Sequence, residues 1–576
     1  MKNKIALYIG LSLISFEVFG QNNPNVTVIE NNAIRNVVPA RKAVGKPEIR
    51  DTTASLPAKN YALVPKTEGV NHETEEIKPA KLKVVEPLSK LYRGYVKAGV
   101  GNYTTPLLDV HYMEKRSRSG SFGLNFKHFS SRNGSATAYS GFADNEFHAY
   151  GKKFLDNYAL SSNFDMEFNG LHHFGGVPDT IAKEIIKQRF SGVQFGGKMK
   201  SYFKDSNKVN HSIYLDYYYF QDFKDSENKH KFDFARENNF DLGADFSFYK
   251  DNYLIHVDAL LDFNHYKSDT INPCVDCDDN VTHRFFDQGN GIFTVNPYVT
   301  LKHGIFDFKL GTTIGIDIPN QITNNAEFHI YPDMELNANL FDGIFAPYVG
   351  ITGGLERNSF KTLARENAFI LSSVQLLNSS KSYEFFGGFR GSLTSKIAFN
   401  LGVKLGKTNN EALFVTDTTF SQDNRFDVVY DDITTTNFVA QLAYLDGEKL
   451  RIYLNGDYYL YRTTNQIEAW YQPDFKITTS ATYDLEDKII GRLDIFATGN
   501  RRASSLKEVE GGVLTDGIYV HTLPLIVDAN IGLEYRLSKK FSAFLNFNNL
   551  VSRRYQKYLR YPVQGINILG GVTLSF

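Results

Sequence analysis

The chain has 576 residues, of which 42% are hydrophobic and 14% aromatic, and its 63 Lys and Arg against 64 Asp and Glu leave a formal net charge of −1. A mean hydropathy of −0.32 excludes a bundle of membrane-spanning helices, and the balanced charge argues against nucleic acid as a main partner. The 34 Tyr and 46 Phe are more than most soluble proteins need, whereas transmembrane β-barrels place such residues in two girdles at the membrane surfaces.

The first 20 residues are typical of a cleaved secretory signal peptide. Lys2 and Lys4 precede an apolar run from Ile5 to Phe16, and Gly20 stands just before the expected cleavage site. The run is too short to anchor the chain in a membrane as a helix. We therefore predict that residues 1–20 are a signal peptide and that the protein is exported.

Residues 21–90 differ in composition from everything that follows. Pro, Lys, Glu and Asn are scattered through them, aromatic residues are few, and no periodicity is sustained, so we predict an extended or disordered extension. One short run within it, 26–30, carries Val26, Val28 and Ile29. It is interpreted either as linker or as a segment that adds to the edge of a partner's sheet.

From Leu91 to the end, strands are joined alternately by very short turns and by long polar loops. The short turns are rich in Asp, Asn, Gly, Ser and Lys, the residues that tight hairpins favour. They lie near Arg116–Gly120, Leu155–Asn157, Lys204–Asn210, Lys250–Asn252, Lys302–Gly304, Phe341–Gly343, Thr394–Lys396, Asp446–Lys449, Glu486–Lys488 and Ser538–Lys540. The long loops include Ser130–Asn145, Phe174–Ser191, Asp222–Asn239, Ser268–Gly289, Arg357–Lys381, Asn409–Thr434, Arg501–Pro524 and Val551–Gln564.

The strands alternate apolar and polar side chains, as lipid outside and water inside a barrel require. Three stretches show this most clearly: Phe328–Leu340, Leu450–Arg462 and Val527–Leu537. Such strands are about 10–13 residues long, enough to cross a bilayer at a tilt, whereas strands of a soluble sandwich average about 5–6. Ten short turns joining eleven loop-linked pairs predict an all-β transmembrane antiparallel β-barrel of about 22 strands over residues 91–576, a size at which the lumen is wide enough to need an obstruction.

The connection 268–289 contains the two cysteines of the chain, Cys274 and Cys277. Three interpretations stay open: a small disulfide in an oxidising compartment, a metal site, or neither. Valine stands at 281, where a calcium loop needs glycine, and a lone CxxC lacks the second pair of a structural zinc site. The residues at calcium-loop spacing are Asp276, Asp278, Asn280 and Asp287.

No catalytic motif is present among the remaining polar residues. The sequence has no nucleophile elbow, glycine-rich phosphate loop or paired-carboxylate motif, so neither an enzyme nor a cofactor is predicted. His172 and His173 lie near a junction of strand and loop and are interpreted as polar residues at the barrel rim. The expected inward charges, which we interpret as pairing across the wall, are Arg451, Asp457, Arg492, Asp494, Glu534 and Arg536.

The last strand has one apolar face and ends on an aromatic residue. Its outward residues are predicted to be Ile566, Ile568, Gly570, Val572, Leu574 and Phe576. This end resembles the terminal signal that the outer-membrane barrel assembly machinery reads, with Gly571, Leu574 and Phe576 at matching offsets. Leu569 occupies a position that is usually polar in that signal.

Two stretches resemble TonB-dependent receptors. Asn549–Tyr555, followed by Tyr561-Pro562 and Gly565, is similar to the C-terminal strands of that family, although Ile566 replaces the usual arginine. Leu91–Tyr103 is similar to the first strand of a group of barrels from Bacteroidetes-type bacteria within the same family. The resemblance implies a transport or receptor barrel in the outer membrane of a Gram-negative bacterium, in contact with lipid.

The N-terminal extension departs from that family. TonB-dependent receptors carry a folded plug of well over a hundred residues inside the barrel, and residues 21–90 show no such pattern of strands and glycines. The resemblance offers a third interpretation of Val26, Val28 and Ile29, as the box that binds an energy-coupling protein. Without a plug, a second hypothesis is a non-transporting structural subunit of an outer-membrane complex with other outer-membrane or periplasmic proteins. A soluble periplasmic β-protein is a third.

Overall fold

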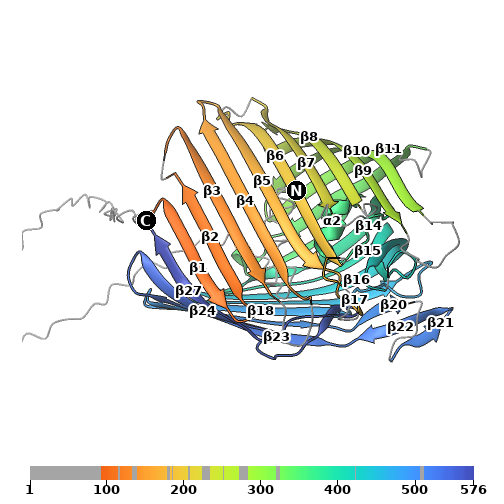
Figure 1. Ribbon diagram of the computed structural model, residues 1–576. Helices are drawn as coiled ribbons and strands as arrows, with labels where there is room; N and C mark the ends of the chain where they lie inside the picture. The colour runs from red at the N-terminus through yellow and green to blue at the C-terminus, as the bar shows by residue number, and fades with distance from the viewer. Residues whose placement is uncertain are drawn as a thin grey trace, which may run out of the picture. The chain divides into compact units, whose positions relative to one another are not determined.

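The computed structural model describes residues 92–576 except for 115–116, 133–138, 178–181, 185, 205–207, 224–233, 251, 272–282, 319–324, 422 and 506–510. Nearly all of this part forms one antiparallel sheet of 22 strands, as the sequence predicts (Figure 1). None of the helices in these residues is long and apolar enough to cross a membrane. The barrel strands are β1 (Gly94–Gly101), β2 (Thr105–Met113), β3 (Gly120–Ser131), β4 (Phe142–Phe154), β5 (Tyr158–His172), β6 (Lys187–Ser201), β7 (Asn210–Phe223), β8 (Phe234–Lys250), β9 (Tyr253–Ile271), β10 (His283–His303), β11 (Phe306–Ile318), β12 (Glu327–Ala338), β13 (Ala346–Glu356), β14 (Ser379–Thr394), β15 (Ile397–Thr416), β16 (Phe426–Asp446), β17 (Leu450–Arg462), β18 (Phe475–Leu485), β19 (Ile489–Thr498), β23 (Ile526–Arg536), β24 (Phe541–Asn548) and β27 (Asn567–Ser575).

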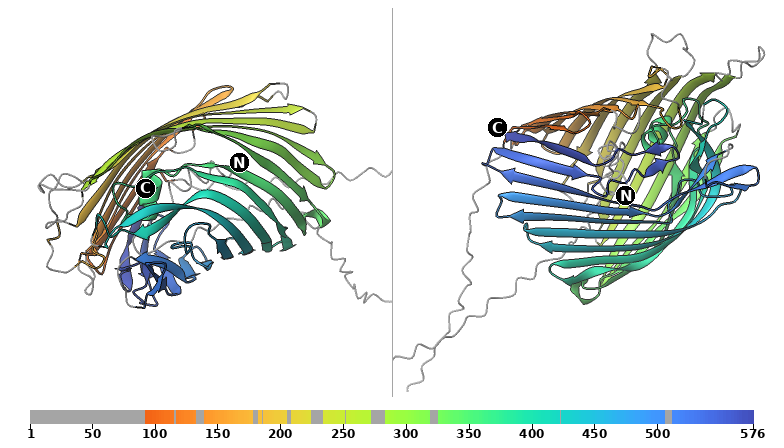
Figure 2. Two further views of the ribbon diagram at one scale, coloured as in Figure 1. Left: turned by 90° about the vertical axis from the view of Figure 1, so that its right-hand side faces the viewer. Right: turned by 60° about the horizontal axis from the view of Figure 1, so that its bottom comes forward.

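The first and last strands close the sheet. β1 pairs with β27 in antiparallel register, beginning with Tyr95 opposite Ser575. The Phe576 carbonyl accepts the N–H of Gly94 at 2.9 Å, and the Phe576 N–H donates to the Gly94 carbonyl at 2.9 Å. The barrel therefore has no free edge at this seam at which another strand could add. Figure 2 shows the wall of strands curving round a wide interior.

The two ends of the barrel differ in their connections. All ten predicted short turns join consecutive strands at one end, here called the turn end, and the eight predicted loops lie at the other, the loop end. The other three connections at the loop end, whose positions were not predicted, are 102–104, 319–326 and 463–474. In outer-membrane barrels the short turns face the periplasm and the long loops face outwards. The smaller elements are η1 (Phe341–Gly343) at the turn end, and α2 (Phe360–Glu366), β20 (Arg501–Ser505), β21 (Val513–Thr515), β22 (Ile518–Leu523), β25 (Gln556–Tyr558) and β26 (Tyr561–Pro562) at the loop end.

The outer face of the wall is apolar, and the inner face is polar. On β12 the outward side chains of Phe328 and Ile330 are 63% and 65% exposed, whereas the inward Tyr331 and Asp333 are buried. The same alternation holds in β27, where Val572 and its outward neighbours are exposed. An apolar belt of this kind around a closed barrel faces lipid. The chain is thus a membrane-spanning barrel of the outer-membrane type.

The hydrophobic core lies inside the lumen rather than between sheets. Inward side chains of β5–β9, β15 and β16 form one cluster with side chains of several loops at the loop end. The largest fully buried side chains belong to this cluster and include Trp470, Tyr266, Phe220, Phe360 and Phe426. This packed apolar cluster lies across part of the lumen, so it is the place where passage through the barrel is expected to be blocked.

Candidate functional site: a loop folded into the lumen

The connection between β13 and β14, residues 357–378, enters the barrel and carries the helix α2; we call it the lumenal loop (Figure 1). A capping box starts the helix: the Thr362 N–H donates to Ser359 Oγ at 3.0 Å, and the Ser359 N–H donates to Thr362 Oγ1 at 3.0 Å. Phe360, Leu363 and Ala364, three and four residues apart, form its buried face.

The N-terminus of α2 rests on a buried carboxylate of the barrel wall. Glu237 on β8 is fully buried and accepts the N–H groups of Phe360 and Lys361, each at 2.9 Å. Asn264 on β9 donates to the same carboxylate at 3.0 Å. The positive end of the helix dipole favours an anion at this position. Glu237 therefore satisfies two N–H groups that a helix of this length leaves without partners.

Two arginines of the lumenal loop pair with acidic residues of the wall. Arg365 donates to both carboxylate oxygens of Glu167 on β5, at 2.9 and 3.0 Å. Arg357 binds Asp262 on β9 through Nε at 2.6 Å to Oδ2 and through a second nitrogen to the backbone carbonyl at 3.0 Å. Forked contacts of this kind fix direction as well as distance. Together with Glu237 they tie the loop to three strands of the opposite wall.

Lys361 is a buried cation in the same region. Its ammonium donates to the Gln194 side chain at 3.0 Å and lies 4.1 Å from the centre of the Tyr218 ring. Burial lowers the pKa of Lys361 to about 8, and the nearby Arg365 acts in the same direction. The charge of Lys361 thus weakens the closed arrangement of the loop at neutral pH.

The second half of the lumenal loop is held mainly by hydrogen bonds to its backbone. Tyr266 on β9 donates its hydroxyl to the Ser372 carbonyl and accepts the Val374 N–H at 3.1 Å. One residue before Ser372, the Leu371 N–H donates to the carbonyl of Phe426, at the start of β16, at 2.8 Å. These bonds satisfy backbone groups that are buried away from water.

Aromatic side chains of another loop complete the core. Tyr561 stacks on Phe369 of the lumenal loop with 3.6 Å between ring centres. Tyr558 donates to the Glu366 carbonyl at 2.8 Å and packs 5.3 Å from the ring of Phe426. Burial of several aromatic rings contributes strongly to stability, at about 1.5–3 kcal/mol for each large apolar side chain. The obstruction is therefore a packed unit built from several loops.

A separate cavity of about 850 Å³ opens beside β3–β6 at the loop end. Among the described residues its lining includes four basic side chains and no acidic one, which makes it attractive to an anion. The lining residues that carry or can carry positive charge are Arg132, His172, Lys183, Lys187 and Arg189.

The predicted barrel-assembly residues occupy the seam between the first and last strands. The side chain of Leu574 faces outwards, as does that of Phe576. A Cβ on Gly571 would lie 2.1 Å from the Ala98 carbonyl oxygen, so only glycine allows this approach of the strands. Their role in assembly stays a prediction.

The other predicted site residues lie apart from the lumenal loop. Cys274 and Cys277 are outside the described residues, as are Val26, Val28 and Ile29 of the extension and the calcium-spaced Asp276, Asp278 and Asn280. Asp287 lies in β10, where it pairs with His265 at 2.9 Å and Lys267 at 3.3 Å. His172 lies at the loop-end rim, as predicted, and its Nδ1 is 3.0 Å from the Gly141 carbonyl.

Sequence reasoning placed the lumenal loop correctly as the connection 357–381 but did not predict that it folds inwards. In retrospect, two features of the sequence indicate that this loop is packed inside the barrel. The spacing of Ser359 and Thr362 is that of a helix cap, and the loop contains many large apolar residues, whereas the other long loops are mostly polar. Those residues are Phe360, Leu363, Phe369, Ile370, Leu371, Val374 and Leu376.

Solved structures share the fold of this chain. The pyoverdine outer-membrane receptor FpvA from Pseudomonas aeruginosa has a TM-score of 0.61 and 10% identity, and the match covers 85% of this chain and 79% of that one. The FrpB iron transporter from Neisseria meningitidis has a TM-score of 0.63 and 9% identity, covering 85% and 82%. The copper transporter OprC has a TM-score of 0.59 and 11% identity, covering 84% and 80%. No family model and no curated protein matches the sequence. At these identities the likeness concerns the fold, and it confirms the prediction of a large outer-membrane β-barrel.

Proposed function

We propose that the protein is an outer-membrane receptor or transporter whose passage is controlled by the lumenal loop. The observation that carries the proposal is the way in which residues 357–378 are held: by contacts to carboxylates of the wall rather than by covalent or strand-to-strand attachment. The fold, shared with receptors and transporters of iron, copper and siderophores, supports the same function. The basic cavity at the loop end favours an acidic ligand.

Opening requires the loop to leave three acidic partners, Glu167, Glu237 and Asp262. A ligand can cause this only if it binds the open state more tightly than the closed state, by about 5.5 kcal/mol to move the populations from 1:99 to 99:1. An energy-coupling protein that pulls on the chain would supply the same difference. As part of this proposal, Val26, Val28 and Ile29 form the segment that such a protein binds.

The remaining parts of the proposal concern the ends of the chain and its cysteines. Residues 1–20 direct export, residues 21–90 are a periplasmic or lumenal extension, and Cys274 and Cys277 form a disulfide in an outer loop. Gly571, Leu574 and Phe576 are read by the barrel assembly machinery during insertion. A Bacteroidetes-type TonB-dependent receptor without a conventional plug fits all of these features.

One observation favours the alternative, a structural subunit of an outer-membrane complex. The stack of Phe369 on Tyr561 and the surrounding buried rings interlock two loops, as expected of a barrel that never opens. The two functions differ in whether the loop must move, and this can be tested without knowing the ligand.

A disulfide staple decides between them. Ile370 and Phe426 form an isolated parallel bridge, and directly paired positions lie close enough for a disulfide. The I370C/F426C variant would be produced in the native host with its own copy deleted, and competitive growth would be measured with and without reductant. We expect the stapled protein to fail and reduction to restore growth to the level of the single-cysteine variants, which measure the cost of truncating the buried Ile370 and Phe426 side chains without a staple. Full complementation by the stapled form would contradict transport and support the structural role.

A further inference from the structure

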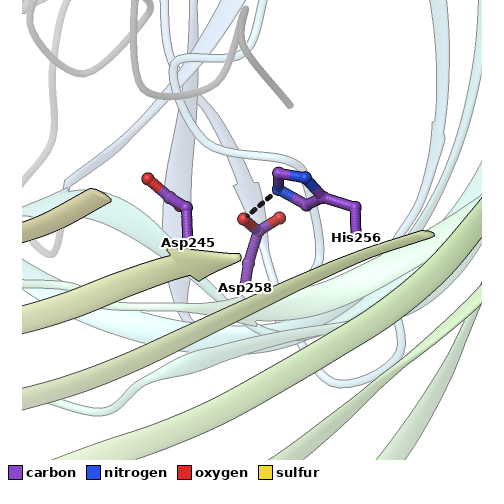
Figure 3. A group of neighbouring side chains, drawn as sticks. All are labelled: Asp245, His256 and Asp258. Atoms are coloured by element: carbon purple, nitrogen blue, oxygen red, sulfur yellow. Dashed lines mark hydrogen bonds and ion pairs between the residues drawn. The ribbon is translucent and has the colours of Figure 1, made fainter. Parts of the chain in front are cut away.

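Three ligand-type side chains meet on the inner face of the wall, away from the lumenal loop. Asp245 lies on β8, and His256 and Asp258 lie on β9, next to the turn that joins the two strands. One possible ligand atom from each lies within 4.8 Å of the others. In Figure 3 the three side chains rise from the sheet on the same side, with Asp258 between the other two.

The register of the two strands explains why these side chains converge. Asp245 is directly opposite Asp258, and His256 is two residues before Asp258, so both share its face. His256 Nε2 lies 2.6 Å from Asp258 Oδ1. Because the three residues are on paired strands close to a tight turn, their backbone positions are fixed before any ligand arrives.

The arrangement brings two like charges together. Carboxylates placed directly opposite on paired strands repel each other, and His256, when protonated, neutralises only one of them. Lys198 on β6 also acts on Asp245, but its ammonium lies over the Tyr214 ring at 5.5 Å. A divalent cation between the carboxylates would turn the repulsion into attraction.

A second observation points to a ligand at the same place. Ser212 on β7 is opposite Asp245 in register and only 5% exposed, and its hydroxyl faces the Asp245 carboxylate without a well-formed hydrogen bond. The Asp258 Oδ2 atom is likewise buried and without a well-formed hydrogen bond in the described part of the chain. Buried polar atoms in native proteins are nearly always satisfied, so two poorly satisfied atoms on the strands that flank Asp245 call for an explanation.

We propose that Asp245, His256 and Asp258 bind a divalent first-row transition metal, with Ser212 beside the ion as a further oxygen donor or as the partner of a bound water. Two carboxylates and one imidazole suit zinc, manganese or iron better than magnesium or calcium. Donors on one ion at about 2.0–2.2 Å lie at most about 4.4 Å apart, so small side-chain rotations close the site.

The site lies between the turn end of the barrel and the point where the lumenal loop is attached to the wall. Asp258 is four residues nearer the turn end of β9 than Asp262, which binds Arg357 of the lumenal loop. That separation is about 13 Å along the strand. A metal ion there sits on the periplasmic side of the loop's attachment to the wall, outside the obstruction itself. The inference does not depend on the proposed transport function.

Calorimetric titration with zinc chloride tests the site on the full-length, chelator-treated protein in detergent. We expect one equivalent to bind, with at least a hundredfold loss of affinity in H256Q and in D258N. H148Q is the matched control, because His148 also faces the lumen and pairs with an aspartate, Asp165, but has no third ligand in the described part of the chain. Heat-modifiable gel mobility shows whether each variant is folded.

A second readout separates a true metal centre from loose association. Cobalt(II) bound by two oxygens and one nitrogen gives visible absorption bands, which zinc should abolish on displacement in the unmodified protein and which D258N should lack. The assignment would be overturned by the absence of a saturable single equivalent, by equal binding in H256Q and the unmodified protein, or by a preference for calcium over zinc. In those cases His256 and Asp258 are an ordinary ion pair of the wall.

Discussion

The Glu237 carboxylate is the strongest single test of how the lumenal loop is held. Replacing it with alanine removes the acceptor of the Phe360 and Lys361 N–H groups and of the Asn264 side chain. Hydrogen bonds to a charged group contribute about 1.5–3 kcal/mol each, and the loss is reduced because the variant no longer buries a carboxylate. We expect a net cost of about 3 kcal/mol to the closed loop.

Amide hydrogen exchange measures this cost where it arises. At 1.4 kcal/mol for each tenfold change, about 3 kcal/mol raises the open population, and hence exchange in residues 359–371, about 100-fold. E237Q keeps an acceptor oxygen of similar size and should give a smaller increase, near tenfold. E335A is the control, since Glu335 faces the lumen on β12 and bonds Asn337 instead. Unchanged exchange in 359–371, or an equal increase throughout the barrel, would refute the anchoring role.

Four further predictions concern the lumenal core, the seam of the barrel, Lys361 and the basic cavity. F360A lowers the free energy of unfolding of the lumenal core by about 3–5 kcal/mol. F195A, which truncates an exposed lipid-facing ring, changes that free energy by less than about 1 kcal/mol. Calorimetry distinguishes the two variants. G571V prevents closure of β1 on β27 and abolishes heat-modifiable mobility, while G197V, whose added Cβ meets nothing within 4 Å, folds normally. Burial lowers the pKa of Lys361 from 10.5 to about 8, so between these pH values the closed loop binds fewer protons than the open loop. The closed state of the loop is therefore stabilised as the pH rises from 8 to 10.5. Limited proteolysis of residues 359–367 should slow over this range, and K361M should remove the pH dependence. Replacing Arg132 and Lys183 with glutamine weakens binding of tripolyphosphate, an anionic probe, about tenfold at low salt, and K396Q at the turn end leaves it unchanged.

The barrel was predictable because its rules are local. Alternation along single strands and the composition of the turns predicted the strand number and the positions of the hairpin turns. Folding the hairpin about the predicted turn Lys250–Asn252 would place Asp245 opposite Val257, whereas β8 continues to Lys250 and the observed register places Asp245 opposite Asp258. The importance of that pair was missed because each aspartate by itself is an ordinary inward residue of a β-barrel.

The obstruction was not predictable in the same way. Glu237 and Phe360 are 123 residues apart, and Tyr558 and Glu366 are 192 apart. Contacts between residues so far apart in sequence form only once the barrel has closed and placed β5, β8 and β9 next to the lumenal loop. No local sequence pattern encodes them. The capping residues Ser359 and Thr362 predict a short helix but not the wall on which it rests.

Conductance of single molecules in planar bilayers tests the central claim most directly. Because Glu356 is paired directly with Ser379, a two-residue Asn-Gly turn can replace residues 357–378 without disturbing β13 or β14. The full-length protein with this replacement should conduct in large steps, and the unmodified protein should stay closed under the same voltage. If the variant with the Asn-Gly turn does not conduct, the lumenal loop is not the obstruction. The same conclusion follows if the unmodified protein conducts in steps as large as those of the variant.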